Sequence, residues 1–311
     1  MAAVLLLVGT LVPAASAEVT KIGTGFDPAI CKDAVVWYDA DGAISYYDIA
    51  DGSRSIIAEA NGSYPHAYGS RVVWMDDSSQ DLRMGVYDLD LMQISYVCGE
   101  FDEFSRPRIS GKNAVWGAGG EIYLCDVEAR ESRAIAKGYD PDVSGDRIAY
   151  VAREERGAVI RVYDANDGTV LTIPYMGDVY SPRIDGWRVV FATAYDGSSD
   201  LYSYDLSREQ LAQVARCDIV SVSSERPDYR GLLDESEIRG NRIAYVKSVS
   251  DDFGDAGIWI YDAAIGGKSM PVGLRGIVEL SIDISEDAIV WGYECPPGDR
   301  TGDCPIYALA G

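Results

Sequence analysis

The chain has 311 residues, of which 47% are hydrophobic, and its 50 acidic against 27 basic residues give a formal net charge of −23. This composition is that of a globular protein with a sizeable core, and it excludes a wholly disordered chain. Proteins that bind nucleic acid meet its phosphates with Lys and Arg, so the negative charge argues against nucleic acid as a partner.

The first 17 residues have the pattern of a secretion signal. Met1 to Ala15 is an apolar run, and Ala15-Ser16-Ala17 has the small side chains that signal peptidase cleaves after. We therefore expect residues 1–17 to be removed and residues 18–311 to form a single domain, either secreted or located at the cell surface or in the periplasm. An uncleaved anchor is the alternative, although about 20 residues are needed to span a bilayer. No later segment is long and apolar enough to do so.

Six cysteines behind a signal peptide suit an oxidising compartment. Cys295 and Cys304 flank a turn-rich loop whose ends must approach each other, so we expect a disulfide between them. Cys125, in the middle of a strand, is a candidate for a free, buried thiol. The cysteines outside the loop allow three pairings that the sequence does not separate: Cys31, Cys98, Cys125 and Cys217.

A repeated unit runs through the rest of the chain and is clearest in residues 180–214. Turn residues there separate four short segments that are β-branched, aromatic or alternating in polarity, and these begin at Pro182, Arg188, Leu201 and Gln210. Four short strands with turns between them are typical of one antiparallel blade of a β-propeller.

Seven such units follow one another, each marked by an aromatic residue near the end of its second strand. These residues are 34 to 54 positions apart, which fits propeller repeats, and they are Trp37, Trp74, Trp116, Tyr150, Phe191, Tyr245 and Trp291. In six units the third strand ends in Asp, which begins turns by accepting a hydrogen bond from its own following backbone. We read these residues as turn formers rather than ligands: Asp48, Asp88, Asp126, Asp164, Asp205 and Asp262.

The last unit has only three strands and ends at Ile306–Ala310, whereas the mature N-terminus begins with an unassigned strand, Val19–Ile22. If the two pair, the seventh blade is complete and no open edge is left. The sequence therefore predicts an all-β protein, a seven-bladed β-propeller of four-stranded antiparallel blades, closed by an N-terminal strand.

The units share the form P-x-I-S-G-x-x-V-V-W followed by I-Y-x-Y-D-L, as in Pro107 through Trp116 and again in Pro141 through Tyr150. In this form the chain resembles the TolB-like β-propeller repeat proteins, in particular secreted archaeal and bacterial ones, over nearly all of residues 18–311. The resemblance implies an extracytoplasmic or cell-surface protein that works through contacts. It carries over no binding residue.

His66 is the only histidine, so any Ser/His/Asp triad or His-based metal site would have to include it. It follows Pro65 in a first strand, and the equivalent positions of the other units are mostly charged. We therefore expect a polar ring near the axis, formed by the innermost strands, rather than a catalytic histidine. The ring consists of Ala29, His66, Arg108, Asp142, Arg183, Glu237 and Asp283.

The strand order places the starts of the first strands, the loops between second and third strands, and the links between blades at one end of the propeller. The longest of these segments are Tyr195–Ser199, Arg216–Ser236, Lys247–Ala256 and Cys295–Cys304. Long loops on a rigid scaffold are where binding usually resides. The polar ring then has two readings: solvated or mutually paired charges, or a site in which Arg108 and Arg183 hold a carboxylate of a glycan or protein.

Carboxylates also gather in the loops between second and third strands, and oxygen-rich loops of this kind can hold Ca²⁺. The candidates are Asp76, Asp77, Asp81, Asp251, Asp252 and Asp255, with Asp196 and Asp200 as a further group. Solvated acidic loops are the alternative. Asn61-Gly62-Ser63 is an N-glycosylation sequon between blades, which indicates an exposed loop.

Two classes of function fit these features. We favour a non-catalytic, secreted or cell-surface propeller that binds or scaffolds an extracellular protein or glycan through its loop-bearing face, with no cofactor except Ca²⁺. The alternative is a propeller enzyme, a polysaccharide lyase or glycoside hydrolase, that uses paired carboxylates. A single histidine and no recognisable acid–base arrangement favour binding.

Overall fold

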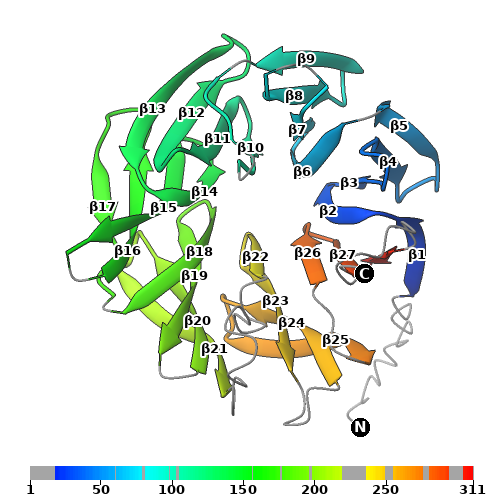
Figure 1. Ribbon diagram of the computed structural model, residues 1–311. Helices are drawn as coiled ribbons and strands as arrows, with labels where there is room; N and C mark the ends of the chain where they lie inside the picture. The colour runs from blue at the N-terminus through cyan, green and yellow to red at the C-terminus, as the bar shows by residue number, and fades with distance from the viewer. Residues whose placement is uncertain are drawn as a thin grey trace, which may run out of the picture.

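The computed structural model describes residues 18–59, 61–78, 81–97, 99–102, 105–155, 157–175, 177–195, 198–218, 236–248, 255–275, 280–293 and 304–310. The strands of this part of the chain form seven four-stranded antiparallel sheets, arranged in a ring (Figure 1). The chain is a seven-bladed β-propeller, which confirms the predicted fold. None of the described segments forms a helix that could cross a membrane.

Each blade is a meander from the axis outward. The innermost strands are β2 (Phe26–Cys31), β6 (Gly62–Tyr68), β10 (Arg108–Ser110), β14 (Tyr139–Ser144), β18 (Asp178–Asp185), β22 (Ser236–Arg239) and β26 (Leu280–Ile284). The second strands are β3 (Ala34–Tyr38), β7 (Arg71–Asp76), β11 (Asn113–Ala118), β15 (Arg147–Glu154), β19 (Arg188–Tyr195), β23 (Arg242–Ser248) and β27 (Ala288–Tyr293). The third strands are β4 (Ile44–Asp48), β8 (Arg83–Asp88), β12 (Glu121–Asp126), β16 (Gly157–Asp164), β20 (Ser198–Asp205), β24 (Asp255–Asp262) and β28 (Pro305–Ala310). The outermost strands are β5 (Arg54–Ala58), β9 (Gln93–Val97), β13 (Glu131–Lys137), β17 (Val170–Thr172), β21 (Gln210–Asp218), β25 (Gly267–Arg275) and, in blade 7, β1 (Val19–Thr24).

Blade 7 takes its outermost strand from the start of the chain. β1 pairs antiparallel with β28, from Val19 opposite Leu309 to Thr24 opposite Pro305. Ile22 of β1 is 1% exposed and packs in a cluster that also contains Trp37 of blade 1. The predicted closure by the N-terminal strand is therefore confirmed, and the two ends of the ring are held by both backbone pairing and a shared core.

The aromatic residues at the second strands form the core between blades. All seven are at most 4% exposed, and each packs within a cluster of buried residues. Fully burying a large apolar side chain stabilises a protein by about 1.5–3 kcal/mol, so each of these positions makes a substantial contribution to the stability of its blade. Close packing also dictates Gly85, which lies opposite Trp74, because a Cβ there would come within 2.1 Å of the indole ring.

The innermost strands begin earlier than the opening prolines suggest. β18 starts at Asp178 and continues through Pro182, because its register shifts between Tyr180 and Arg183. A residue in such a bulge makes no ladder hydrogen bond, so proline is tolerated there. The same shift occurs in β2, β6 and β14.

We call the end of the ring where the innermost strands finish the turn end. Tight turns join first to second strands there, as at Gly111, Gly145 and Gly186, whose φ angles are 61°, 58° and 57°. The third-to-fourth turns lie at the same end. Each of the six predicted turn-forming Asp residues accepts a hydrogen bond through Oδ1 from the N–H two residues further on, at 2.8–3.0 Å, which confirms that reading.

Candidate binding site at the hub

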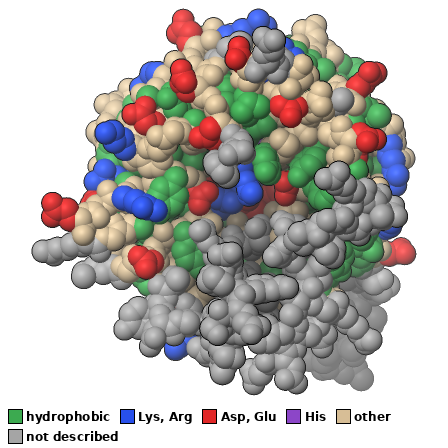
Figure 2. All heavy atoms as spheres, in the orientation of Figure 1, with side chains coloured by type: hydrophobic (Ala, Val, Ile, Leu, Met, Phe, Trp, Pro, Cys, Tyr) green, Lys and Arg blue, Asp and Glu red, His purple; other side chains and the backbone are tan. Residues whose placement is uncertain are grey.

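At the opposite end, which we call the loop end, the innermost strands begin. Figure 2 shows this face, with basic and acidic side chains meeting at its centre. We define the hub as the seven equivalent residues of the innermost strands: Ala29, His66, Arg108, Asp142, Arg183, Glu237 and Asp283. The hub is less exposed than a ring at an open mouth would be, since its side chains are buried or at most 18% exposed.

Three hub side chains link one blade to the next. His66 Nδ1 accepts a hydrogen bond from the N–H of Ile109 at 3.1 Å, and Asp142 Oδ2 accepts one from Ile184 at 2.7 Å. Asp283 Oδ2 likewise accepts from Ile30 at 2.8 Å, across the closure between blades 7 and 1. Buried polar groups need such partners, so these three positions have a structural role in holding the ring.

The imidazole of His66 is held neutral. Burial lowers its pKa well below the ordinary value of 6.5, and the guanidiniums of Arg108, Arg239 and Arg183 lower it further. With Nδ1 accepting from a backbone N–H, the ring is positioned as a structural acceptor.

The other hub charges form a triad across three blades. Arg108 Nη2 lies 2.9 Å from Glu237 Oε1, and Arg183 Nε lies 2.8 Å from the same oxygen. Arg183 Nη1 also donates to the carbonyl of Pro182 at 3.0 Å. Two guanidiniums thus meet one carboxylate oxygen at the centre of a protein whose net charge is −23, and Asp142 is a further carboxyl that interacts with both of them. Each arginine is paired with Glu237, so neither is an isolated cation.

Two hub carboxyls have pKa values driven in opposite directions. Burial raises the pKa of Asp142 above its ordinary value, and Arg108 and Arg183 offset this only in part. Burial opposes ionisation of Glu237 as well, but the same two arginines outweigh it and hold the pKa of Glu237 below 4.5. Glu237 is therefore ionised, and Asp142 is the more readily protonated of the two.

Arg239 is a hub neighbour that the repeat alignment does not single out. It lies two residues after Glu237, so strand alternation puts both on the same face of β22. Its guanidinium lies over the ring of Tyr68 at 4.5 Å, and its Nε donates to the carbonyl of Ile284 at 3.4 Å. Burial raises the pKa of the neighbouring Asp283 to about 7, which Glu237 reinforces and Arg239 opposes.

The rim of the loop end has an unusual backbone. Two residues before the hub position, Asp27, Tyr64, Asp140 and Ser181 have φ between 46° and 52°, and each precedes a proline. L-residues rarely adopt this left-handed region, least of all before proline. The X-Pro step is the sequence signal for these four positions, but it does not reveal the conformation, since Arg106 also precedes a proline and is not among the residues with positive φ.

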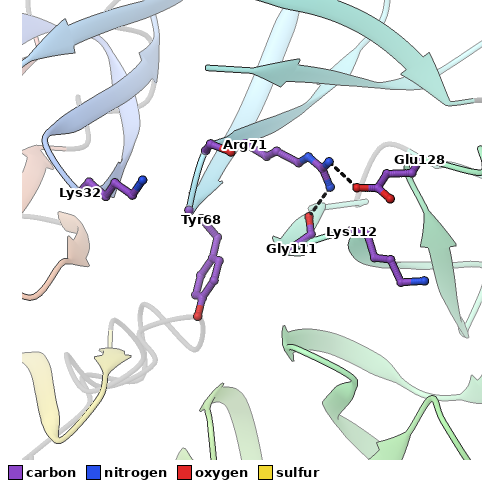
Figure 3. A pocket seen from close by; sticks show the side chains of 8 residues that line it. Lys32, Tyr68, Arg71, Gly111, Lys112 and Glu128 are labelled. Carbon is purple, nitrogen blue, oxygen red and sulfur yellow. Dashed lines mark hydrogen bonds and ion pairs between the residues drawn. The ribbon is translucent and has the colours of Figure 1, made fainter. Parts of the chain in front are cut away.

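The turn end carries a pocket of about 530 Å³ lined by Lys32, Tyr68, Arg71, Lys112 and Glu128, among others (Figure 3). Two of its cations are already paired. Arg71 contacts Glu128 at 2.7 Å and donates to the carbonyl of Gly111 at 2.9 Å, and Lys112 contacts Asp126 at 2.7 Å. Like the hub arginines, these two pocket cations are therefore paired with carboxylates.

The first calcium candidate does not have the geometry of an ion site. Asp76 is buried, accepts a hydrogen bond from the N–H of Ser78 at 2.9 Å and lies 3.5 Å from Arg83. Within the described residues, no three carboxylates gather closely enough to hold a metal ion, Asp77 and Asp81 included. Of the other calcium candidates, Asp200 is among the described residues. The structure does not describe Asp196, Asp251 and Asp252 or the side chain of Asp255.

Two of the cysteines whose side chains the structure describes are free. Cys31 and Cys125 are buried thiols, as expected for Cys125, and burial raises the pKa of each to about 12. Cys31, whose pairing the sequence leaves open, is free and packs in the hydrophobic core between blades 1 and 2. Cys304, the residue before β28, is buried, but Cys295 lies outside the described residues, as do Cys98 and the side chain of Cys217. The Cys295–Cys304 pairing stays a prediction.

Other predicted features of the loop end stay predictions as well. Asn61 is exposed, with φ of 61°, but no observation tests its glycosylation. Residues 1–17 and most of the long loops, including 219–235, 249–254 and 294–303, lie outside the described residues.

No family model matches the chain, and no curated protein matches its sequence. Among solved structures, the chain is similar to the β-propeller domain of the Trilobed protease from Pyrococcus furiosus, with 14% identity and a TM-score of 0.66 over 92% of this chain and 95% of that one. That domain is described as having an open velcro topology, whereas β1 closes the ring here.

A second similar structure is the oligogalacturonate lyase from Vibrio parahaemolyticus, with 9% identity and a TM-score of 0.61 over 94% of this chain and 93% of that one. At such identities these likenesses show the propeller fold alone. TolB from Acinetobacter baumannii aligns at 13% identity over 94% of this chain and 79% of that one, with a TM-score of only 0.48. The TolB-like assignment stays a prediction.

Proposed function

We propose that this protein is a non-catalytic propeller, secreted or at the cell surface, that binds a carboxylate-bearing extracellular protein or glycan at the loop end of its hub. One observation carries the proposal: Arg108 and Arg183, from different blades, converge on one carboxylate oxygen of Glu237 at the centre of a strongly acidic molecule. Guanidinium groups bind carboxylates through charge-assisted hydrogen bonds, and a position fixed by β-strands limits the entropy lost on binding.

Glu237 sets the affinity of this site. Its carboxylate occupies both guanidiniums, so an incoming carboxylate competes with it or shares the remaining N–H donors. Removing both arginines would strand a largely buried carboxylate, which typically costs a few kcal/mol of stability. The informative changes are therefore single ones that leave one ion pair in place or that neutralise Glu237.

Calorimetric titration of the mature protein with oligouronates and with hexaglutamate tests the proposal. Arg183→Met keeps the Arg108–Glu237 pair and should weaken binding about tenfold or more, as loss of an anchoring arginine can. Glu237→Gln frees both guanidiniums and should strengthen binding. Arg188→Met is the matched control, because Arg188 lies in the same blade and pairs with Asp205 at 3.5 Å, away from the hub.

If neither probe binds, or if Arg183→Met and Arg188→Met have the same effect, the hub is not the binding site. The enzyme alternative has one specific observation in its favour. Asp142 and Glu237 have pKa values displaced in opposite directions, which is the pattern of an acid–base pair. Cleavage of an oligouronate by the wild type, lost in Asp142→Asn, would replace the binding proposal with a lyase or hydrolase.

A further inference from the structure

A row of aromatic side chains crosses blades 1 and 2 at the loop end. Phe26, at the start of β2, stacks on Tyr38, at the end of β3, with ring centroids 5.2 Å apart. Tyr38 meets the edge of Tyr64, at the start of β6, at 6.3 Å, and the guanidinium of Arg106 lies 4.7 Å from the centroid of the Tyr64 ring. The three rings are half-buried and Arg106 is exposed. The row therefore combines an apolar surface with a cation.

The row adjoins the charged hub. Asp27 follows Phe26 and lies close enough to Arg106 and Arg108 for both guanidiniums to favour its ionised form, although burial raises its pKa overall. Arg108 in turn contacts Glu237. The carboxyl of Asp27, the guanidiniums of Arg106 and Arg108, and the aromatic row thus lie near one another. Figure 2 shows hydrophobic side chains on this face beside the central charges.

The backbone fixes this arrangement. Asp27 and Tyr64 have φ of 46° and 51°, and each is followed by a proline inside a register shift of its strand. The backbone at both residues is therefore fixed in a conformation that a free chain seldom adopts, which limits the backbone ordering that ligand binding requires.

We propose that Phe26, Tyr38 and Tyr64, with Asp27 and Arg106, form a subsite for one sugar ring of an oligosaccharide of uronic acids. A uronate offers three chemically distinct faces: C–H groups that pack on aromatic rings, hydroxyls that donate to a carboxylate, and a carboxylate that arginine binds. The aromatic row would pack against the C–H groups, Asp27 would accept hydrogen bonds from the hydroxyls, and the arginines would bind the carboxylate. An acidic peptide offers carboxylates and N–H donors, but it has no rigid ring of C–H groups to stack on the aromatic row. The inference rests on the proposed function and selects glycan over protein as the ligand.

Titration of the mature protein with tetramers of galacturonate, glucuronate and mannuronate, and with their methyl esters, tests the ligand class. At least one tetramer should bind, and esterification should abolish or strongly weaken binding because the ester cannot pair with guanidinium. Equal affinity for an acid and its ester would overturn the proposal.

Two variants test the subsite. Tyr64→Leu and Arg106→Gln should each weaken binding of the tetramer about tenfold, as loss of an aromatic or arginine anchor can. Trp187→Leu is the matched control, because it removes a similar pair at the turn end, where Arg147 lies 3.4 Å from the Trp187 ring centroid. Thermal melts verify that each variant is folded. If Tyr64→Leu does not fold, the binding measured for Arg106→Gln decides the test.

The outcomes separate this inference from the function on which it rests. If a tetramer binds and loses affinity in Arg183→Met but not in the two subsite variants, the aromatic row is not a sugar subsite. If none of the tetramers binds, but hexaglutamate binds and its affinity is lower for Arg183→Met, the ligand is an acidic peptide. The sugar subsite is then rejected and the proposed function stands. If none of the probes binds, both proposals fail.

Discussion

At the hub, position in the repeat and chemical role are separate properties. His66, Asp142 and Asp283 occupy the same place as Arg108 and Arg183, yet the first three accept backbone hydrogen bonds from the next blade and the arginines bind Glu237. The repeat supplies seven positions around an axis, and the side chain at each one decides whether it joins blades or gathers charge.

Asp283 should make stability depend on pH near neutrality. Its pKa is raised from 3.8 to about 7, so between these values the folded protein holds a proton that the unfolded chain has lost. Stability from this group is therefore full below pH 4 and is lost as the pH rises toward 7. Asp283→Asn mimics the protonated form. Melts from pH 5 to 8 should show the wild type losing stability relative to the variant.

The difference between the two proteins is the quantity to measure, because other hub groups titrate in both. His66 is neutral when folded and becomes protonated on unfolding below about pH 6.5, which destabilises both proteins in acid. Glu237 has a lowered pKa, so its contribution is present above 4.5 and is lost only at lower pH. Parallel melting curves for wild type and Asp283→Asn across this range would contradict the assignment.

Among the elements, β1 carries the closure of the ring. It covers the edge of β28 and places Ile22 in the core between blades 7 and 1. Without it, blade 7 has an exposed edge, and its junction with blade 1 has a cavity where Ile22 lay.

Deleting residues 18–23 should therefore lower the melting temperature by roughly 5–10 °C, because losing a buried Ile alone typically costs 2–5 kcal/mol. Differential scanning calorimetry measures this directly. Thr20→Ala, an exposed change on the same strand, should leave the melt within about 1 °C of wild type, as surface substitutions usually do. An unchanged melt after the deletion would mean that β1 contributes no stability in solution.

For the whole molecule, the net charge of −23 is the dominant electrostatic feature. Self-repulsion of this size destabilises a compact state and is screened by salt, so the melting temperature should rise with NaCl. A bound Ca²⁺ would add stability by mass action beyond this screening.

Millimolar Ca²⁺ should raise the melting temperature more than NaCl of equal ionic strength if the acidic loops hold the ion. With Asp76 engaged by Ser78 and Arg83, the loop of Asp251, Asp252 and Asp255 is the candidate to remove. Replacing its three carboxylates with Asn should abolish the excess shift and leave the NaCl response nearly intact. Identical shifts with the two salts would reduce these loops to screened surface charge.

The propeller itself follows from the sequence, because its determinants are local. Apolar and polar residues alternate within short strands, an aromatic residue recurs near the end of each second strand, and Asp recurs where a turn must begin. Closure of the ring also follows from local evidence, since Val19–Ile22 has no partner in its own neighbourhood and the last unit lacks a strand. Aligning the repeats also identifies the seven hub residues, because they occupy the same position in each unit.

The site required the tertiary structure, because its partners come from different blades. Glu237 meets Arg108 and Arg183 although 129 and 54 residues separate them, and no periodicity states which of the hub side chains reach one another across the axis. The aromatic row was missed for a related reason. Phe26 and Tyr64 occupy a bulge in which the strand alternation that sequence reasoning relies on is interrupted, so only the folded backbone decides which way these rings face.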